Sequence, residues 1–233
     1  ALNREWDAEL ERVYSLEHGI PISQGEVIGV VNRLSRPQDV VVCAAGSLPG
    51  DLHKLWRTRD PKGYHLEYGY SCMGYEIAGG LGVKLADPSR EVYVMVGDGS
   101  YLMMNSEIAT MVQEGIKVTI VLLDNHGFAS IGSLSESVGS GGFGTEYRLR
   151  DGQALQGEVS PIDYVANAAS LGAHAVRATT RDELAGAIEE ARKIENRPVC
   201  IVVETDREQR VGNYGAWWDV PVAEVSESDS VNA

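Results

Sequence analysis

Two stretches decide the fold: Val92–Ser100 (VYVMVGDGS) and Val118–Gly127 (VTIVLLDNHG). Each begins with an apolar, mostly β-branched run that predicts a buried strand, and each ends in a polar turn that contains glycine. The residues between the two runs predict a helix through Glu114. Continuous apolar strands joined by helices are typical of a parallel sheet covered on both faces, so the expected fold is α/β.

The same alternation continues outward in both directions. Further strands are predicted at Val40–Ala44, His174–Val176 and Val199–Val203. Two capping boxes, in which Ser23 precedes Glu26 and Thr180 precedes Glu183, mark helix starts. Helices are expected over residues 2–18, 23–34, 47–56, 73–86, 161–171 and 180–195.

These elements predict one domain over residues 21–205, with a linker helix over 1–20 and an irregular tail over 206–233. Residues 126–160 are rich in Gly and Ser without clear periodicity, which indicates a long loop that is either functional, as a lid or substrate loop, or disordered. The adjacent tryptophans Trp217–Trp218 suggest that the tail docks on another surface or folds back on its own domain.

The composition and net charge exclude some classes of binding partner. The 233 residues carry a formal net charge of −14, which repels nucleic acids and anionic membranes. No apolar stretch approaches membrane-spanning length, and an anionic ligand would need a metal ion or backbone dipoles to offset the negative field. The odd number of cysteines, Cys43, Cys72 and Cys200, favours reduced thiols and a cytoplasmic protein.

Polar residues follow two neighbouring strands of the expected sheet. In a parallel sheet, ligands bind beyond the carboxyl ends of the strands, and strands joined by one helix commonly lie close together. Asp98 and Asn125 should therefore emerge near one another, and the carbonyl of Gly127 would add a third oxygen ligand. Mg²⁺ prefers such donors and usually keeps phosphate oxygens in its remaining positions. The sequence thus predicts a magnesium site at these residues.

The first of these turns also suits a diphosphate. Gly97 and Gly99 lack side chains, so the backbone can approach the ligand, and Ser100 follows at a helix start, where free N–H groups favour an anion. Either turn alone is ordinary turn chemistry. Together, 27 residues apart at two strand ends, Asp98 and Asn125 resemble the thiamine-diphosphate motif, which runs from GDG to a terminal Asn on the next strand. This resemblance implies thiamine diphosphate and Mg²⁺ as cofactors.

Other segments extend the resemblance. Ser71–Gly74 (SCMG) is similar to the family segment that supports the bent cofactor, which implies that Met73 lies between its two rings and that the Ser71 carbonyl accepts a hydrogen bond from the aminopyrimidine. A core position for Met73 is the alternative. The resemblance also implies a cofactor-binding set of Gly46, Ser47, Leu48, Ser71, Met73, Gly97, Asp98, Gly99, Ser100, Asn125, Gly127 and Phe128.

Longer stretches of sequence resemble one particular family. They are residues 44–56 (AAGSLPGDLHKLW), 64–86 (YHLEYGYSCMGYEIAGGLGVKLA), 97–110 (GDGSYLMMNSEIAT), 141–148 (GGFGTEYR) and 215–227 (GAWWDVPVAEVSE), and they are similar to the trihydroxycyclohexane-dione acylhydrolases of myo-inositol breakdown. Membership would imply a hydrolase that opens a cyclic 1,2-diketone to a deoxyglucuronic acid. The resemblance covers the C-terminal, diphosphate-binding third of the family's subunit. The domain that binds the aminopyrimidine and supplies an activating glutamate is expected on another chain or outside this segment, in a homo-oligomer.

Several functional questions stay open at this level. The chain is either the diphosphate-binding half of such a hydrolase or a cofactor-binding module without activity, and a related decarboxylase or carboligase is a further alternative. Glu67 and Glu76 lie near the Met73 turn, but neither matches the activating glutamate. Four polar residues have no firm role, being either substrate contacts or surface charges: His53, His126, Glu146 and Arg148.

Overall fold

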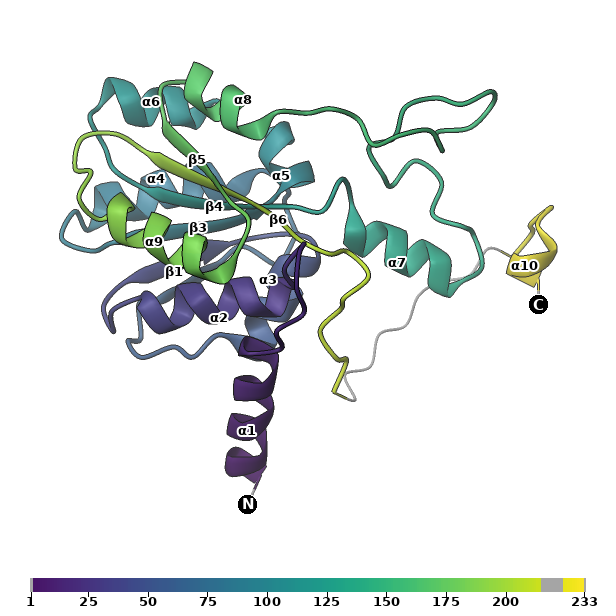
Figure 1. Ribbon diagram of the computed structural model, residues 1–233, viewed down its shortest axis with the longest axis horizontal. Coiled ribbons are helices and arrows are strands. Elements are labelled where there is room, and N and C mark those ends of the chain that lie inside the picture. Colours follow the sequence, from purple (N-terminus) through teal and green to yellow (C-terminus); the bar gives the residue numbers. More distant parts are fainter. Residues whose placement is uncertain (1, 215–223, 233) are drawn as a thin grey trace. The chain divides into compact units, whose positions relative to one another are not determined.

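The computed structural model describes residues 2–214 and 224–232, and it confirms the α/β class (Figure 1). Within these residues, one parallel six-stranded sheet has the order β2-β1-β3-β4-β6-β5. Its strands are β1 (Val40–Cys43), β2 (Tyr64–Leu66), β3 (Val92–Gly97), β4 (Thr119–Asp124), β5 (His174–Ala178) and β6 (Val199–Glu204). All strands point the same way, so all their carboxyl ends lie at one edge of the sheet.

Helices cover both faces of the sheet (Figure 1). One face packs against α2 (Gln24–Leu34), α3 (Ser47–Leu55) and α9 (Arg181–Ala191), and α1 (Leu2–Tyr14) packs on α2. Apolar residues of these four helices join alternate strand residues in one core cluster. The other helices of the sheet unit are α4 (Tyr75–Ala86), α5 (Asp98–Met103), α6 (Glu107–Gln113) and α8 (Tyr164–Ser170). Both predicted capping boxes are confirmed, at the starts of α2 and α9.

Strand side chains alternate between the two faces, which explains why the strands are apolar throughout. Tyr93 and Met95 of β3 belong to the cluster under α2, α3 and α9. Val94 between them faces α4, where a Cβ added to Gly80 would come within 2.3 Å of its Cγ2 atom. The small-residue helix predicted over 73–86 therefore packs closely on β3 because Gly80 has no side chain.

Some predicted boundaries are wrong for local reasons. The helix expected to run through Glu114 is two helices, α5 and α6, separated by residues 104–106. Helix α4 begins at Tyr75, not at Met73, because its N-cap Gly74 is left-handed (φ +92°). Strand β2 was not predicted. Helix α8 begins at Tyr164, with Asp163 as its N-cap, and not at Pro161.

Residues 126–160 are not the continuous loop that their composition suggests. They include α7 (Ala129–Ser137), in which Ile131 and Leu134 are three residues apart, as on one face of a helix, although Ser and Gly are poor helix formers. The turns and isolated bridges around α7 are hydrogen-bonded mainly within the segment, as where the Tyr147 N–H donates to the His126 carbonyl (2.8 Å).

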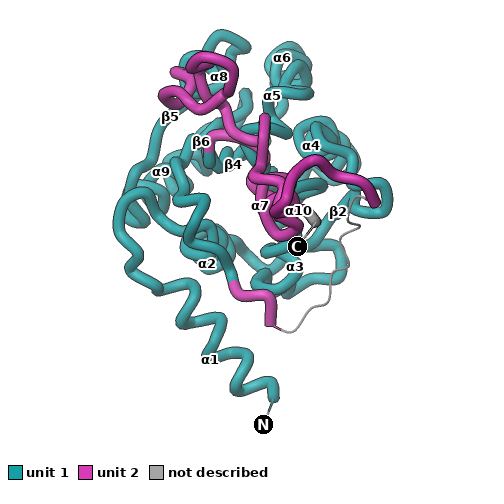
Figure 2. The backbone as a smooth tube through the Cα atoms, turned by 90° about the vertical axis from the view of Figure 1, so that its right-hand side faces the viewer, with its two compact units in different colours: residues 1–125, 163–211 teal, residues 126–162, 212–233 magenta. Residues whose placement is uncertain are grey.

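The chain forms two compact units (Figure 2). Unit 1 comprises residues 1–125 and 163–211 and holds the sheet; unit 2 comprises residues 126–162 and 212–233 and holds α7 and α10 (Asp229–Asn232). These boundaries differ from the division expected at residues 20 and 205, because α1 joins the core of unit 1 while the segment after Asn125 leaves it. Trp217 and Trp218 lie outside the described residues.

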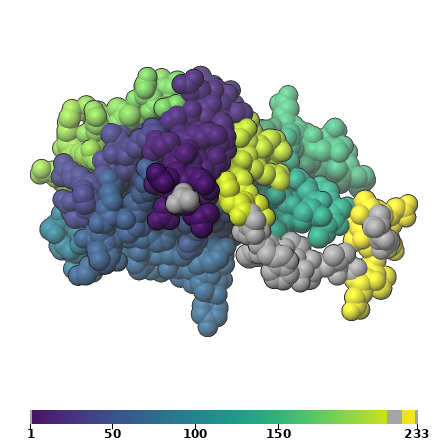
Figure 3. Space-filling view, turned by 90° about the horizontal axis from the view of Figure 1, so that it is seen from below, coloured from purple at the N-terminus to yellow at the C-terminus, as the bar shows by residue number. Residues whose placement is uncertain are grey.

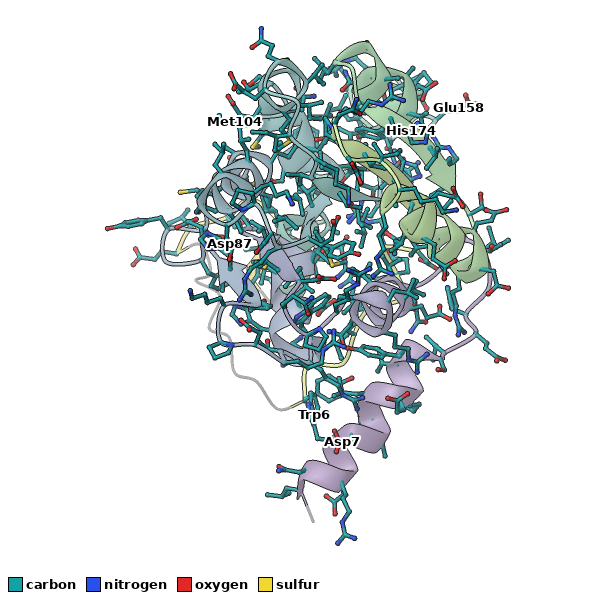
Figure 4. All side chains as sticks on the ribbon, turned by 90° about the vertical axis from the view of Figure 1, so that its left-hand side faces the viewer. Trp6, Asp7, Asp87, Met104, Glu158 and His174 are labelled. Carbon is teal, nitrogen blue, oxygen red and sulfur yellow. The ribbon has the colours of Figure 1, made fainter. Side chains whose placement is uncertain are left out.

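Helix α1, in dark purple in Figure 3, is shorter than the expected linker helix and packs on α2. The Tyr14 hydroxyl donates a hydrogen bond to the Leu55 carbonyl, and Gly29 leaves room for the Tyr14 ring. Trp6, labelled in Figure 4, packs at the rim of the same core. None of the helices in the described part of the chain is long and apolar enough to cross a membrane.

Candidate functional site

The candidate site lies at the carboxyl ends of β1, β3 and β4. Strand β1 has β2 on one side and β3 on the other, so the strand order changes direction there, which is where open α/β sheets place their ligands. Strands β3 and β4 are paired, with Gly97 opposite Leu123. The strands before Asp98 and Asn125 were expected to lie side by side or one strand apart, and they lie side by side.

Asp98 and Asn125 are both buried at this edge. Asp98 is fully buried at the start of α5, and its Oδ1 atom accepts a hydrogen bond from the Gly99 N–H (2.9 Å). The Oδ1 atom of Asn125 is buried and has no hydrogen-bond partner among the described residues. A buried amide oxygen without a partner is costly, and a bound cation would satisfy it.

The donor set fits a hard cation. Carboxylate and amide oxygens are ligands that Mg²⁺ prefers, whereas zinc sites use mainly Cys and His. Among residues 2–214 and 224–232, no cluster of three His, Cys, Asp or Glu side chains is placed to hold a metal ion. The cysteines are free; Cys43 and Cys200 are buried and Cys72 is exposed.

Ser100 makes a contact that the sequence did not indicate. Its hydroxyl donates to the carboxylate of Glu76 (2.8 Å to Oε2) and accepts a hydrogen bond from the Gly74 N–H (2.7 Å). Glu76 also accepts from the N–H groups of Gly74 (3.0 Å) and Ala45 (3.3 Å). Burial raises the pKa of Glu76. The Ser100 side chain is therefore engaged within the protein, which leaves its backbone N–H as its possible contact to an anion.

The Met73 turn is exposed and conformationally restrained. Ser71 is exposed with a left-handed backbone (φ +52°), and Met73 is half-buried and lies outside the buried core. Gly74 cannot carry a side chain, because a Cβ would come within 2.8 Å of the Cβ of Met104, labelled after α5 in Figure 4. This placement does not support the core alternative for Met73.

Beside Met73, Glu67 organises the same turn. Its carboxylate accepts hydrogen bonds from the N–H groups of Cys72 (2.8 Å) and Tyr70 (3.2 Å). The Cys72 N–H, followed by the smaller contribution of the Tyr70 N–H, lowers the pKa of Glu67. His53 is exposed, with its ring 5.7 Å from Tyr64 and 5.4 Å from Tyr68.

The turn after β1 offers a ligand backbone groups more than side chains. Gly46 is the N-cap of α3 with φ +104°, a conformation that favours glycine, and no side chain caps this helix. The half-buried Ser47 has its hydroxyl 3.5 Å from the Gln24 side-chain oxygen. Leu48 belongs to the buried core, so its backbone and not its side chain is available to a ligand.

Gly127 and Phe128 belong to unit 2, where they contact Thr145, Glu146 and Tyr147 of the FGTEYR segment. Gly127 (φ +145°) pairs with Glu146, and a Cβ there would come within 2.3 Å of the Thr145 carbonyl oxygen. The Phe128 N–H donates to the same carbonyl (2.8 Å), and its ring contacts Tyr147. Glycine is thus required for the turn at Gly127.

Of the remaining candidates, Glu146 and Arg148 form an ion pair, as expected if they are mutually paired loop charges. His126 has a left-handed backbone (φ +61°).

Comparison with known proteins adds three findings. The family model described as the C-terminal TPP binding domain of thiamine pyrophosphate enzymes matches residues 44–203. Two relatives named 3D-(3,5/4)-trihydroxycyclohexane-1,2-dione hydrolase, from Bacillus cereus and Bacillus anthracis, are each 46% identical over 217 residues, which is 92% of this chain and 34% of each relative. This chain therefore spans about a third of their length.

A solved structure shares the fold. The thiamine diphosphate-dependent 4-hydroxybenzoylformate decarboxylase of Rhodococcus jostii RHA1 superposes with a TM-score of 0.68 at 20% identity, over 79% of this chain and 32% of the decarboxylase. At that identity, the likeness shows a common architecture.

Proposed function

Because this chain belongs to the thiamine pyrophosphate enzyme family, as its C-terminal cofactor-binding domain, we propose that it is the diphosphate-binding half of a hydrolase. The proposed reaction is cleavage of a carbon–carbon bond in a cyclic 1,2-dione, trihydroxycyclohexane-1,2-dione, to give 5-deoxy-glucuronic acid in inositol breakdown. Support for this substrate comes from the names of relatives that are 46% identical over 92% of the chain.

The observation that carries the cofactor assignment is the buried, unpartnered Oδ1 atom of Asn125 beside the strand that ends at Asp98. We assign the Mg²⁺ ligands to the Asp98 carboxylate, this oxygen and the Gly127 carbonyl. A divalent cation here would offset the repulsion between a diphosphate and a chain with a net charge of −14. The peptide groups at Gly46–Leu48, Gly97, Gly99 and Ser100 would contact the diphosphate, with Phe128 nearby in sequence.

Bound thiamine diphosphate supplies an electron sink for carbon–carbon bond cleavage. The roles of this chain's residues are to bind and orient. Met73 is half-buried at an exposed turn and would present an apolar side chain against which the cofactor bends, and the Ser71 carbonyl would accept a hydrogen bond from the aminopyrimidine. Such effects are positioning effects, which lower the entropic part of the barrier.

The complete site needs a pyrimidine-binding domain, which we propose lies on another chain or in a further part of the protein. The proposed assembly is a cytoplasmic homo-oligomer.

Two measurements test the proposed function. Calorimetry should show Mg²⁺-dependent binding of thiamine diphosphate, and dione hydrolysis should appear only when the N-terminal two thirds of the Bacillus cereus relative are supplied. Hydrolysis by this chain alone would contradict the half-site assignment. In the supplemented assembly, turnover of pyruvate in place of the dione would indicate a decarboxylase or carboligase, and cofactor binding without any turnover would indicate a non-catalytic module.

A further inference from the structure

One buried carboxylate joins three turns of the candidate site. Glu76, on the first turn of α4, is 1% exposed. Its Oε1 atom accepts from the Ala45 N–H (3.3 Å), and its Oε2 atom accepts from the Gly74 N–H (3.0 Å). The Ser100 hydroxyl lies 2.9 Å from Oε1 and 2.8 Å from Oε2. These contacts link segments that are 24 and 31 residues away from Glu76 along the chain.

The groups that form hydrogen bonds with this carboxylate all act as donors to it. The Ser100 oxygen accepts the Gly74 N–H, so its own proton points to Glu76. Among the described residues, no Lys, Arg or His side chain forms an ion pair with Glu76. Such an arrangement requires an acceptor at both oxygen positions, which a carboxylate provides and an amide does not.

Each linked segment carries a residue of the proposed cofactor site. Ala45 precedes Gly46, Gly74 follows Met73, and Ser100 lies two residues after Asp98. We infer that Glu76 is a positioning residue, whose carboxylate holds the diphosphate turn, the Met73 turn and the metal-ligand turn in one arrangement before the cofactor binds. This inference rests on the proposed function. It assigns Glu76 no contact with substrate or cofactor.

The chain contains a matched control. Glu26 is also 1% exposed and accepts hydrogen bonds from two backbone N–H groups, of Glu17 (2.9 Å) and Ser23 (3.2 Å), and from the Ser23 hydroxyl (2.9 Å). It differs in having Arg181 3.6 Å away and in lying at the start of α2, outside the proposed site. A glutamine at either position places an NH₂ group against a backbone N–H, so both substitutions leave a buried donor unpaired.

The test compares Glu76→Gln and Glu26→Gln in the full chain. Both variants should lower the melting temperature by similar amounts. Only Glu76→Gln should weaken calorimetric binding of thiamine diphosphate with Mg²⁺, by about tenfold or more, because one lost buried hydrogen bond has that effect when it acts on binding. Without cofactor, hydrogen exchange at the amides of Ala45 and Gly74 should rise in Glu76→Gln and stay unchanged in Glu26→Gln.

The outcomes separate the inference from the proposed function. Absence of binding by the wild-type chain would overturn the proposed function. Wild-type binding with equal affinity in Glu76→Gln, or an equal loss in both variants, would overturn the positioning role and leave the function standing. If Glu76→Gln fails to fold, Ser100→Ala removes one link and keeps the carboxylate. It should weaken binding severalfold and raise exchange at Gly74, and unchanged values for both would overturn the inference.

Discussion

The amino ends and the carboxyl ends of the strands, called here the amino edge and the carboxyl edge of the sheet, differ in the partners of their buried charged and polar groups. At the amino edge, the buried Lys117 pairs with Glu91, to which the Thr119 hydroxyl also donates (3.0 Å). Arg90 beside them contacts Asp60 (3.0 Å). Opposite charges thus meet within the chain. At the carboxyl edge, Glu76 is surrounded by N–H and O–H donors, and the Asn125 Oδ1 atom has no partner among the described residues.

This difference teaches where an external cation belongs. The charges at the amino edge are paired internally, whereas the buried Oδ1 atom of Asn125, which has no partner among the described residues, is where a cation would bind. Natural proteins keep such unsatisfied groups where they serve function, at some expense in stability. The contrast therefore makes separable predictions: changes at the carboxyl edge should alter cofactor affinity, and changes at the amino edge should alter stability alone.

The largest effect is expected at Asp98. Replacing its carboxylate in Asp98→Asn removes the one anionic ligand of the proposed Mg²⁺ set, so the affinity for thiamine diphosphate with Mg²⁺ should fall by a factor of about 100 or more. Calorimetry measures this directly. Asp87→Asn, which alters an Arg90 contact at the amino edge, is the control and should bind normally. Equal affinities for both variants would remove Asp98 from the metal site.

The next effect should appear at the opposite edge. Lys117→Met leaves Glu91, which is 20% exposed, without its lysine partner. The free energy of unfolding should fall by about 2 kcal/mol, less than for a fully buried pair because Glu91 keeps some contact with water. Urea denaturation measures the loss. Below the unfolding transition, cofactor affinity should be unchanged; a parallel loss of affinity would show that the two edges are not independent.

A smaller change at Asn125 should separate binding from stability within one side chain. Asn125→Leu has similar volume and removes a buried oxygen that has no partner among the described residues. The cofactor-free chain should be as stable as wild type, or more stable by up to about 1 kcal/mol, because no hydrogen bond to that oxygen is lost. Binding with Mg²⁺ should weaken by about tenfold. A clear loss of stability without cofactor would mean that the Asn125 amide has a structural role.

The sequence predicted those features that depend on residues close together along the chain. The strands were predictable because a strand buried on both faces is apolar throughout, and Asp98 and Asn125 stood out because polar residues follow such runs directly. Strand β2 (YHL) is a half-buried edge strand of three residues, too short to show a pattern. The link between Glu76 and Ser100 is invisible for another reason. It joins residues 24 apart, and only the strand order brings them together. A lone acidic residue in the small, apolar helix YEIAGGLGVKLA was its one available signal.

The smallest expected effect is on the pH dependence of the free energy of unfolding, measured without cofactor or Mg²⁺ for one variant at each edge. Burial raises the pKa of Glu76 above its ordinary 4.5, so protonation of this carboxylate is more favourable in the folded chain than in the unfolded chain. The contribution of protonated Glu76 to the free energy of unfolding is present below about pH 4.5 and is lost as the pH rises through the pKa that Glu76 has in the folded chain. Hydrogen bonds from Arg90 lower the pKa of Asp60 below its ordinary 3.8, so its contribution is present above that value and lost as the pH falls.

The two variants that test these opposite signs are Glu76→Gln and Arg90→Gln, in urea denaturation from about pH 2.5 to about pH 7.5. The advantage of wild type over Glu76→Gln should shrink as the pH rises above about 4.5, with a slope of at most about 1.4 kcal/mol per pH unit for one group. Arg90→Gln should lose less stability than wild type on acidification, because Asp60 no longer has a lowered pKa. If the advantage over Glu76→Gln instead grows with pH, the three donors around Glu76 outweigh its burial, and the carboxyl edge already stabilises a negative charge before any cation arrives.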